Sequence, residues 1–413
     1  KRRLEYQRKV FAMKQVRDCV SGSDSIKRSG ELYAPMPSGM RYQTEATAIT
    51  GTGQSNPLSD RTVAINEAPW YHSNPAYSAY IHRAKFPDLT GNTLRGLVGI
   101  ATREDPEIEL PSNIAYLEEL ATLDGSSIYD LYENCVSALF QVGRHALVLD
   151  IRQDNTMYIA EYSSESYINW EIEVVDGRRV QTYAEFETCE TIDDEEVKKS
   201  LVYSLEQGEG ENGKYTCFVY KYTNGKLDED GRVEILFQGK PVNRIPVVNI
   251  GAERNTPVPD AIPLLGITDC ALDIYRHSAD LNQAHFMTCN PTLVFLGVDQ
   301  DDAPRTIGST VAICLSDPNS DAKYVTTDTS ALGHVKEYIQ DVFGEAVLYG
   351  ASLLGPTKKA AESAEALNLR QASSGATLVT IVARVGAAIE EVLEMAATIS
   401  GGKGEVEFTP NYE

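Results

Sequence analysis

The stretch Gly208–Thr216, GEGENGKYT, has the spacing of a phosphate-binding loop. Four residues separate two glycines, and Lys214 follows the second glycine, as in loops whose backbone N–H groups surround phosphates. However, Tyr215 stands where a serine or threonine must hold magnesium, and Glu209 and Glu211 place negative charge where the phosphates would lie. The next residues, TCFVYKY, predict a strand and not a helix N-terminus. We therefore expect no nucleotide site here.

The histidines and carboxylates form no recognisable metal or catalytic motif. His277 and His285 are eight residues apart on one predicted helix, whereas zinc chelation from a helix uses a spacing of four. The sequence contains neither HExxH nor GxSxG. The acidic runs Asp193–Glu196 and Asp228–Asp230 predict solvated loops, because a metal site needs converging ligands. A carboxylate-dependent metallohydrolase stays open as an alternative, with no specific motif in its favour.

The cysteines predict neither a disulfide framework nor a zinc site. They are odd in number, widely spaced and contain no CxxC pair. Buried thiols in a reducing compartment are the expectation for such a pattern. The seven positions are Cys19, Cys135, Cys189, Cys217, Cys270, Cys289 and Cys314.

Composition indicates a folded, acidic protein of two to four structural units. Hydrophobic residues make up 42% of the 413, and 37 Lys and Arg face 60 Asp and Glu, a formal net charge of −23. This balance disfavours binding of nucleic acid or anionic membrane by net attraction, so a DNA contact would have to be local. No apolar run is long enough to span a bilayer, and the basic start KRRLEYQRKV lacks a following apolar segment. We predict a cytoplasmic protein without a membrane partner.

Periodicity in the first half predicts helices followed by a sheet. Residues 21–60 read as loops, and the first seventy residues are assigned no role. Helical spacing is expected around 77–98, over 112–123 with Ser112 as N-cap, and over 128–142. Either Ser126 or Ser127 caps this last helix and Gly143 ends it. The strand HALVLDIR follows, and from 157 to about 248 apolar residues alternate between turn signals such as Asn224-Gly225, which predicts an antiparallel region.

The second half returns to helical period. Apolar stripes predict a helix over 262–290, ended by Pro291, and another over 330–353, ended by Gly355-Pro356. Three short strands, TLVFLG, STVAICL and KYVTT, are expected between them. A long helix over 366–400 stops at Gly401-Gly402.

This succession of elements resembles the portal proteins of tailed bacteriophages. NRIPVVNIGAERN before LLGITDCALDIYRHSADLNQAHFMTCNPTLVFLG looks like the family's entry to its first stem helix. GEAVLYGASLLGPTKKAAESAEALNLRQASSGATLVTIVARVGAAIEEVLEMA looks like its tunnel-loop passage. YLEELATLDGSSIYDLYENCVSALFQVGRHALVLDIR and YSSESYINWEIE are similar to wing segments. The resemblance covers about residues 71–413 and depends on the order of elements, because the individual motifs are degenerate.

The resemblance implies an α+β, portal-like subunit with a mixed α/β wing, a two-helix stem, a small β-containing clip and a long helix after a tunnel loop. The segments are a wing over 1–261 with an antiparallel β region over 157–250, a stem helix over 262–290, a clip over 291–329, a second stem helix over 330–353, a tunnel loop over 354–365, a long wing helix over 366–400, and the start of a crown or C-terminal segment over 401–413.

The resemblance also implies a function. Portals form a ring, usually of roughly twelve subunits, at one capsid vertex. Double-stranded DNA passes through the ring during packaging and ejection. The implied partners are further copies of the chain, the terminase motor, the head-to-tail adaptor, and major capsid and scaffolding proteins. The terminase supplies the ATP hydrolysis, so neither catalysis nor a cofactor is expected. The implied location is the virion, assembled in the bacterial cytoplasm; an adaptor or minor capsid component is the alternative virion protein.

The loop LLGPTKKAAESAEA carries the residues expected to touch DNA. The resemblance places Lys358 and Lys359, with Gly355, Pro356 and Thr357, at the narrowest point of the channel. There the two lysines would meet phosphates as point charges, which hold less specifically than the fork of arginine. The alternative is a solvated turn whose lysines complement the dipole of the preceding helix.

The apolar stripes of the two stem helices have two possible roles. Ile274, Leu281, Val342 and Val347 belong either to the core of one subunit or to the interface between neighbours, and the sequence leaves both open.

Overall fold

The computed structural model describes residues 2–38, 40, 74–152, 154, 156–175, 177–192, 195–207, 215–237, 240–289, 292–298, 318–325, 330, 332–354, 364–401 and 404–411. Helices and antiparallel sheets are both extensive, which confirms the predicted α+β class. The chain divides into two compact units. Unit 1 comprises Lys1–Ser21, Asp88–Asp269 and Ala346–Glu413, and unit 2 comprises Gly22–Pro87 and Cys270–Glu345.

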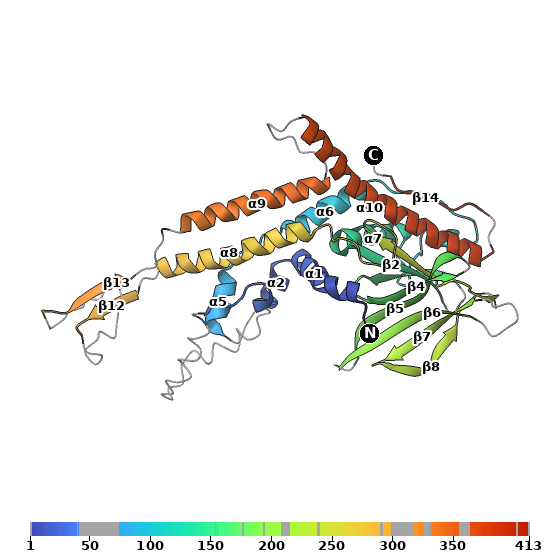
Figure 1. The fold of residues 1–413 in the computed structure, drawn as a ribbon, viewed down its shortest axis with the longest axis horizontal. Coiled ribbons are helices and arrows are strands. Elements are labelled where there is room, and N and C mark those ends of the chain that lie inside the picture. Colours follow the sequence, from blue (N-terminus) through green and yellow to red (C-terminus); the bar gives the residue numbers. More distant parts are fainter. Residues whose placement is uncertain are drawn as a thin grey trace. The chain divides into compact units, whose positions relative to one another are not determined.

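Figure 1 labels the helices and most of the longer strands. The helices are α1 (Leu4–Ser21), α2 (Ser23–Arg28), α5 (Pro75–Arg83), α6 (Leu89–Ala101), α7 (Ile128–Val142), α8 (Leu265–Cys289), α9 (Leu332–Leu354) and α10 (Ala364–Ile399), with 3-10 turns η1 (Gly30–Leu32) and η2 (Ala115–Leu117). The strands are β1 (Glu107–Glu109), β2 (Arg144–Ile151), β3 (Met157–Ser163), β4 (Tyr167–Val175), β5 (Arg178–Ile192), β6 (Glu195–Gln207), β7 (Tyr215–Thr223), β8 (Lys226–Glu234), β9 (Leu236–Phe237), β10 (Lys240–Pro241), β11 (Val247–Gly251), β12 (Thr292–Leu296), β13 (Asp321–Val325) and β14 (Glu407–Thr409). Unit 2 contains α2, η1, α5, β12 and β13; α8 and α9 contribute to both units, and the other elements belong to unit 1.

Helix α7 begins and ends where its sequence predicts. The Ser127 hydroxyl accepts the N–H of Asp130 at 3.2 Å, and the Asp130 carboxylate accepts the N–H of Ser127 at 3.0 Å, a reciprocal capping box. Gly143 ends the helix with a φ of 70°, in the left-handed region that favours glycine. A Cβ at Gly143 would also lie 2.4 Å from the carbonyl oxygen of Ala261. Of the two predicted serines, Ser127 is therefore the cap, and Gly143 is required by both conformation and space.

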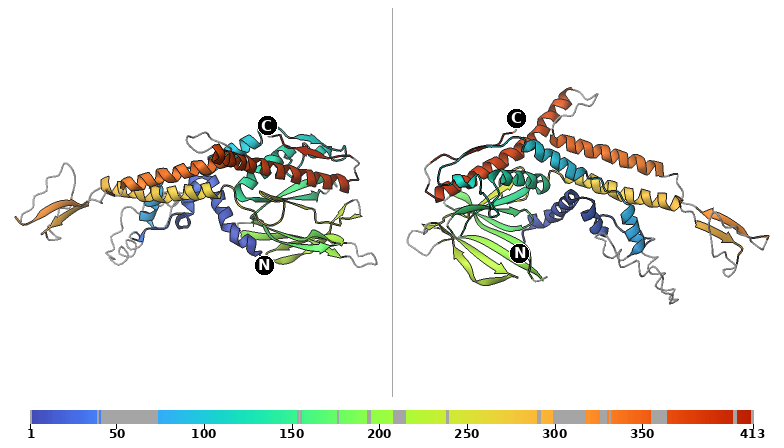
Figure 2. Two further views of the ribbon diagram at one scale, coloured as in Figure 1. Left: turned by 45° about the horizontal axis from the view of Figure 1, so that its top comes forward. Right: turned by 180° about the vertical axis from the view of Figure 1, so that it is seen from behind.

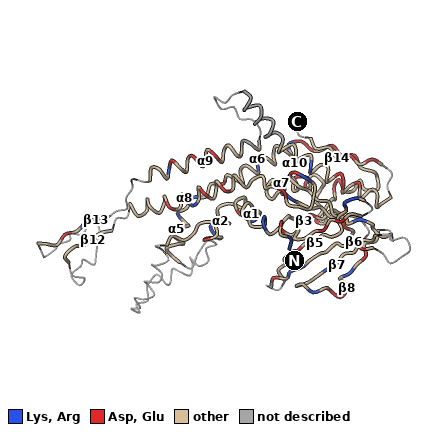
Figure 3. The backbone as a smooth tube through the Cα atoms, in the orientation of Figure 1, with Lys and Arg blue, Asp and Glu red and all other residues tan. Residues whose placement is uncertain are grey.

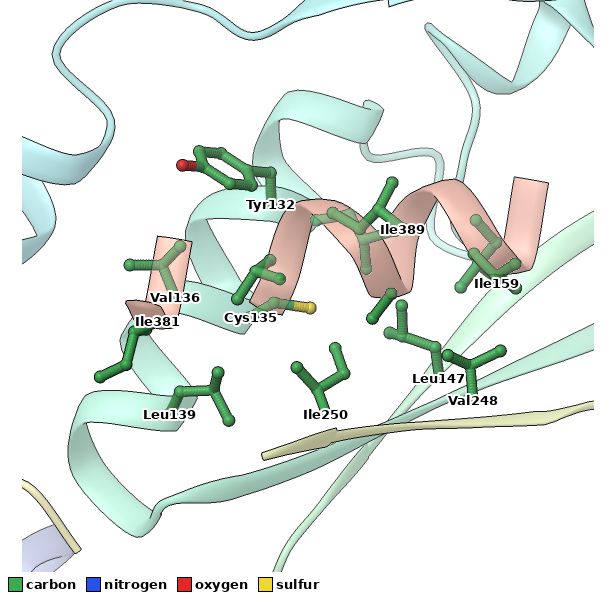
Figure 4. Packing of buried hydrophobic residues seen from close by; sticks show 14 of the residues in the cluster. Tyr132, Cys135, Val136, Leu139, Leu147, Ile159, Val248, Ile250, Ile381 and Ile389 are labelled. Atoms are coloured by element: carbon green, nitrogen blue, oxygen red, sulfur yellow. The ribbon is translucent and has the colours of Figure 1, made fainter. Parts of the chain in front are cut away.

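The main core of unit 1 lies between a three-stranded antiparallel sheet and the helices α7 and α10. The sheet has the strand order β11-β2-β3, and β2 contributes Leu147 and Leu149 to this core. Figure 4 shows Leu147 and Ile250 of the strands beside Leu139 of α7 and Ile389 of α10. Strand β2 is buried on both faces, which explains why HALVLDIR reads as a continuous apolar run.

The second sheet of unit 1 is a five-stranded antiparallel meander with the order β4-β5-β6-β7-β8. The predicted turn at Asn224-Gly225 joins β7 to β8, with φ values of 49° and 76° that fit a tight hairpin. Aromatic side chains dominate its buried face, and the rings of Tyr167 and Phe186 lie 4.6 Å apart. Ala146 and Val148 of β2 join this second cluster from the opposite face of β2 to the main core.

Arg144, at the start of β2, is fully buried beside Tyr167 and Trp170 of the second cluster. Its guanidinium donates to the carbonyl oxygens of Pro257 at 2.6 Å, Ser164 at 2.8 Å and Tyr167 at 2.6 Å, and to the Ser164 hydroxyl at 3.1 Å. It also lies 4.6 Å from the ring centre of Tyr167 and 5.0 Å from that of Trp170. Burial lowers the pKa of Arg144 to about 10, so the group stays charged at neutral pH.

One acidic run lies on a strand and another ends on one, where the sequence predicts loops. Glu195 and Glu196 begin β6, a central strand of the five-stranded sheet, whereas Asp193 and Asp194 are outside the described residues. The run Asp228–Asp230 lies within β8, whose residues are all exposed except Gly231. An edge strand is held by backbone pairing and not by side-chain burial, so its acidic side chains can stay in water. Strand β8 ends at Glu234, and a separate β9–β10 hairpin follows.

Two further predictions are wrong in the first half of the chain. The helix expected over 112–123 is only the turn η2, because the carbonyl oxygens of Glu118 and Ala121 accept the N–H groups of Ile128 and Ile159 instead of continuing a helix. The region 21–60 is not all loop, since α2 and η1 lie within it. Residues 41–60 are outside the described residues.

The helices of the second half follow the predicted order. Helix α8 lies within 262–290, α9 closely matches 330–353, and α10 begins two residues before 366. Gly401, with a φ of 72°, follows the end of α10 and confirms the predicted stop. Strand β14 then pairs with β1 in an antiparallel register, Ile108 opposite Phe408, and Phe408 is buried in the main core. The assignment of these elements to wing, stem, clip and crown stays a prediction.

Candidate functional site

The predicted DNA-contacting loop falls between two described helices. Helix α9 ends at Leu354 and α10 begins at Ala364. The five predicted site residues between them, Gly355, Pro356, Thr357, Lys358 and Lys359, all lie outside the described residues. Their role as DNA-channel residues therefore stays a prediction, and the site can be built only from the helices that flank it.

Helix α9 has one buried face and a second apolar face in solvent. Val342 and Ala346 are buried, at 8% and 3% exposure, on the stripe that also carries Leu353. Phe343 and Val347, four residues apart and thus on one side of the helix, are exposed at 46% and 50%. Ordinary surface helices carry polar residues on this side, so the helix offers an apolar surface for a further contact.

Helices α8 and α9 contact each other in both units. In unit 2, the Tyr338 hydroxyl donates to the Asp273 carboxylate at 2.8 Å, and its ring lies 4.7 Å from that of His277. The hydrogen bond to Asp273 raises the pKa of Tyr338. In unit 1, the ring of Tyr349 lies 3.4 Å from where a Cβ of Gly266 would be, so the glycine allows a close approach. Two exposed tyrosines of α9 thus already have partners within the chain.

The structure divides the four stem residues that the sequence left between core and interface. Ile274 and Val342 are buried within one chain, at 6% and 8% exposure. Leu281 is half-buried, whereas Val347 is half-exposed. Of the four, Val347 is thus the exposed one, and with Phe343 it forms an exposed apolar surface that is called the α9 apolar face below.

The predicted clip contains one described hairpin. Strands β12 and β13 pair with Thr292 opposite Val325 and Leu296 opposite Asp321. The side chains of β13 are all exposed, with Tyr324 at 65% and Val325 at 56%. The third predicted strand, STVAICL, lies outside the described residues. The hairpin offers apolar side chains to water.

Charged residues are distributed over all the described parts of the chain (Figure 3). Figure 3 shows acidic residues on helices and sheets alike. A local exception in unit 2 joins Arg83 and Lys85 to His285 of α8 around one shallow pocket. Arg83 lies 4.2 Å from the ring centre of Phe286, and burial lowers its pKa. The sequence did not predict this group, because its members are about 200 residues apart in the chain.

The cysteines follow the predicted pattern only in part. Cys19, Cys135, Cys217 and Cys270 are buried free thiols. Cys189 and Cys289 are exposed, so the expectation of buried thiols is wrong for these two, and Cys314 is outside the described residues. Burial raises the pKa of the Cys135 thiol well above its ordinary value, as does the nearby Glu161 carboxylate.

The phosphate-loop pattern and His277 are the other groups that the sequence raises as candidates for catalysis or ligand binding. Tyr215 and Thr216, where a phosphate-binding loop would lead into a helix, begin strand β7, so the predicted strand is confirmed; residues 208–214 are outside the described residues. His277 contacts Asp273 and Tyr338, which gives it an interhelical role. No helix in the described part of the chain is long and apolar enough to cross a membrane.

One family model matches the chain. Described as a domain of unknown function, DUF4055, it matches residues 263–399, about a third of the sequence. The matched segment begins just before α8 and ends with α10, so it contains both stem-like helices, the hairpin and the long helix. No curated protein matches the sequence.

Several solved structures are distantly similar. A chain from the neck of an empty GTA particle, computed with C6 symmetry, is 12% identical with a TM-score of 0.44, over 79% of this chain and 81% of that one. A chain from the virion of a native gene transfer agent (GTA) particle is 13% identical with a TM-score of 0.42, over 79% and 80%. A chain from the neck of a native GTA particle, computed with C12 symmetry, is 12% identical with a TM-score of 0.42, again over 79% and 80%.

Proposed function

We propose that this chain is a portal-type virion protein, which forms a ring of roughly twelve copies at one capsid vertex and conducts double-stranded DNA. The observation that carries the proposal is the succession α8, β12–β13 hairpin, α9, lysine loop and α10. This succession supports the stem, clip, second stem helix, tunnel loop and wing helix inferred from the sequence. Figures 1 and 2 show α8, the β12–β13 hairpin, α9 and α10 following one another along the chain.

The α9 apolar face provides a surface for the ring contact. A ring closes when one surface of a subunit meets a different surface of its neighbour at a fixed rotation. Neighbouring chains with a formal charge of −23 each repel, so an apolar contact such as that of Phe343 and Val347 must supply local attraction. The repulsion predicts that rings form more readily as salt screens the charge.

The acidic balance suits a conduit. Dense phosphate pairing along a channel wall would retain DNA, whereas a predominantly negative wall lets a polyanion pass in both directions. Lys358 and Lys359 are then the sparse cations that contact phosphates transiently from the loop between α9 and α10.

The hairpin β12–β13 and its flanking residues are the proposed docking site for the terminase and later the head-to-tail adaptor. Exposed Tyr324 and Val325 favour a protein contact, because aromatic and aliphatic side chains are common anchors of interfaces. ATP hydrolysis is assigned to the terminase, and the chain itself is proposed to have no catalytic activity. Contacts with major capsid and scaffolding proteins belong to the proposed wing.

Changing both loop lysines to alanine tests the conduit role. The variant Lys358→Ala with Lys359→Ala is expected to assemble normally, because the ring contact is proposed to lie on the helices and not on the loop between them. It is expected to change the amount of DNA packaged or retained per particle. The measurement is the DNA content of purified particles that carry the variant, compared with wild type. Lys336→Ala, an exposed lysine on α9, is the matched control. Unchanged packaging by the double variant would remove the DNA-contact role from these lysines.

A further inference from the structure

Three side chains that could bind a metal ion meet inside unit 1. One ligand atom each from Cys135 of α7, His145 of β2 and Glu161 of β3 lies within 4.8 Å of the other two. This is the only group of three or more such side chains within that distance among the described residues. The three residues are separated in the sequence and match no spacing motif for zinc, so only the fold brings them together.

The packing of α7 on strands β2 and β3 brings the three side chains together. Cys135 and Leu139 are four residues apart on the apolar face of α7, and Figure 4 shows the sulfur of Cys135 pointing into the core. In the β2–β3 ladder Leu147 stands opposite Glu161, and His145 lies two residues before Leu147 on the same face of the sheet. Since Leu147 faces the α7 core, His145 and Glu161 face it as well.

One ring nitrogen of the buried His145 has no hydrogen-bond partner among the described residues. It is 5% exposed, and its Nε2 lies 3.2 Å from the Oε2 of Glu161. Its Nδ1 is buried and has no hydrogen-bond partner among the described residues. Buried polar atoms without a partner are rare in native proteins, and a bound ion or water is one explanation for them. A half-turn of the imidazole exchanges each ring nitrogen with a ring carbon, so the orientation of the ring decides which nitrogen faces a ligand.

We propose that Cys135, His145 and Glu161 bind one divalent cation of the zinc class. The ligands are a thiolate, a neutral imidazole and a carboxylate, and a water molecule completes a four-coordinate site. This inference is independent of the proposed portal function. It departs from the prediction, made from cysteine spacing, that the chain has no zinc site.

The distances fit such a site after a small adjustment. Zinc lies about 2.0–2.1 Å from histidine nitrogen, about 2.0–2.2 Å from carboxylate oxygen and about 2.3 Å from sulfur, so ligand atoms in a tetrahedron are about 3.3–3.6 Å apart. The observed nitrogen–oxygen separation of 3.2 Å already has this length. The sulfur lies within 4.8 Å of both other atoms, so each of these separations must shorten by about 1.2 Å at most to reach about 3.6 Å.

The charges also balance. A thiolate and a carboxylate carry two negative charges, which a divalent cation neutralises, and a neutral complex is the form that an apolar surrounding tolerates best. On binding, the proton of the Cys135 thiol is released to water, and a bond from sulfur to the cation replaces the S–H bond. No oxidation or reduction takes place.

Glu161 provides the path by which the cation reaches the site, and its carboxylate is oriented by a neighbouring side chain. The Glu161 side chain is 26% exposed, which gives the cation a path from solvent, whereas Cys135 is fully buried. Asn134 donates from Nδ2 to Oε1 of Glu161 at 3.3 Å and so orients the carboxylate. The bound ion would join α7 to β2 and β3 in addition to the apolar contacts between them.

Cobalt(II) titration of the full chain tests the site. Cys189, Cys289 and Cys314 are first changed to serine, so that neither the two exposed thiols nor Cys314 can bind the metal. After removal of metal by a chelator, one equivalent of Co²⁺ is expected to give the near-ultraviolet charge-transfer absorption of a cobalt–thiolate bond, and Zn²⁺ is expected to displace it. Cys135→Ala should abolish this absorption. Glu161→Gln should weaken binding by more than the roughly 10–100-fold that loss of a supporting second-sphere group costs.

The matched control is Cys217→Ala, which removes another buried thiol, from the second cluster, and should leave the cobalt spectrum unchanged. Circular dichroism establishes that each variant is folded, and if Cys135→Ala is not, the partly exposed Glu161→Gln decides the outcome. Absence of a thiolate band at one equivalent of Co²⁺ would overturn the proposal. So would a band that persists in folded Cys135→Ala, or binding in Glu161→Gln as tight as in the parent chain.

Discussion

Replacing Arg144 by methionine is expected to lower the free energy of unfolding by about 3–5 kcal/mol, the range for loss of one partner from a buried charged network. The buried guanidinium donates to the carbonyl oxygens of Pro257, Ser164 and Tyr167. Methionine fills much of the volume but leaves these oxygens without their hydrogen bonds. It also removes the contact of the cation with the rings of Tyr167 and Trp170.

Urea denaturation followed by tryptophan fluorescence measures this effect, since Trp170 lies against Arg144. Arg244→Met is the matched control, because Arg244 is 46% exposed and its ion pair with Glu391 at 2.9 Å is at the surface, where such pairs contribute about 1 kcal/mol or less. The prediction is wrong if the two variants shift the unfolding midpoint equally. Arg144→Lys is expected to remain destabilised, because lysine has no planar fork for acceptors on different sides.

Replacing Val347 by aspartate is expected to prevent ring assembly while the single chain stays folded. Val347 is 50% exposed, so a charge there is solvated in the isolated subunit. In the proposed ring the same position meets a neighbour, and each interface would bury a carboxylate without a partner. Because the substitution recurs at every interface, its cost is repeated around the ring, and we expect a complete shift to monomers or small oligomers.

Size-exclusion chromatography with light scattering measures this shift. Val174→Asp is the matched control: Val174 is 70% exposed on β4, the same substitution adds the same charge, and rings are expected to form. Rings that persist in Val347→Asp would show that the α9 apolar face is not the contact, even if the protein is a ring.

Local signals explain what could be predicted from the sequence. Ser127 and Gly143 bound α7 because a cap and a left-handed terminus each need a particular residue type. Asn224-Gly225 specifies its hairpin for the same reason. The helices of the second half, α8 to α10, are long enough for their periodicity to outweigh local exceptions.

Predictions failed where tertiary contacts decide the structure. In β6 the alternation of Leu201, Tyr203 and Leu205 is preceded by a charged run, Glu195–Lys199, which obscures the start of the strand. Pairing of β1 with β14 joins segments about 300 residues apart, and neither three-residue strand has a pattern of its own. Both Val342 and Val347 fit the helical apolar pattern of α9, and only the folded chain shows that Val342 is buried and Val347 is exposed.

The two candidate sites also differ in whether local sequence or tertiary packing defines them. The lysine loop was found from its composition and its place between two periodic segments, and its five site residues stay a prediction. The group of Cys135, His145 and Glu161 was not found, because its members lie on a helix and two strands and converge only through packing and register. A sequence pattern identifies a metal site only when the ligands share one local element or a fixed loop.

The most direct test of the portal proposal is the mass and shape of the assembled protein. Native mass spectrometry with negative-stain imaging, at low and high salt, reports both. The proposal predicts closed rings of roughly twelve subunits with a central opening, and a larger share of rings at the higher salt. A stable monomer or dimer at every salt and protein concentration would contradict it.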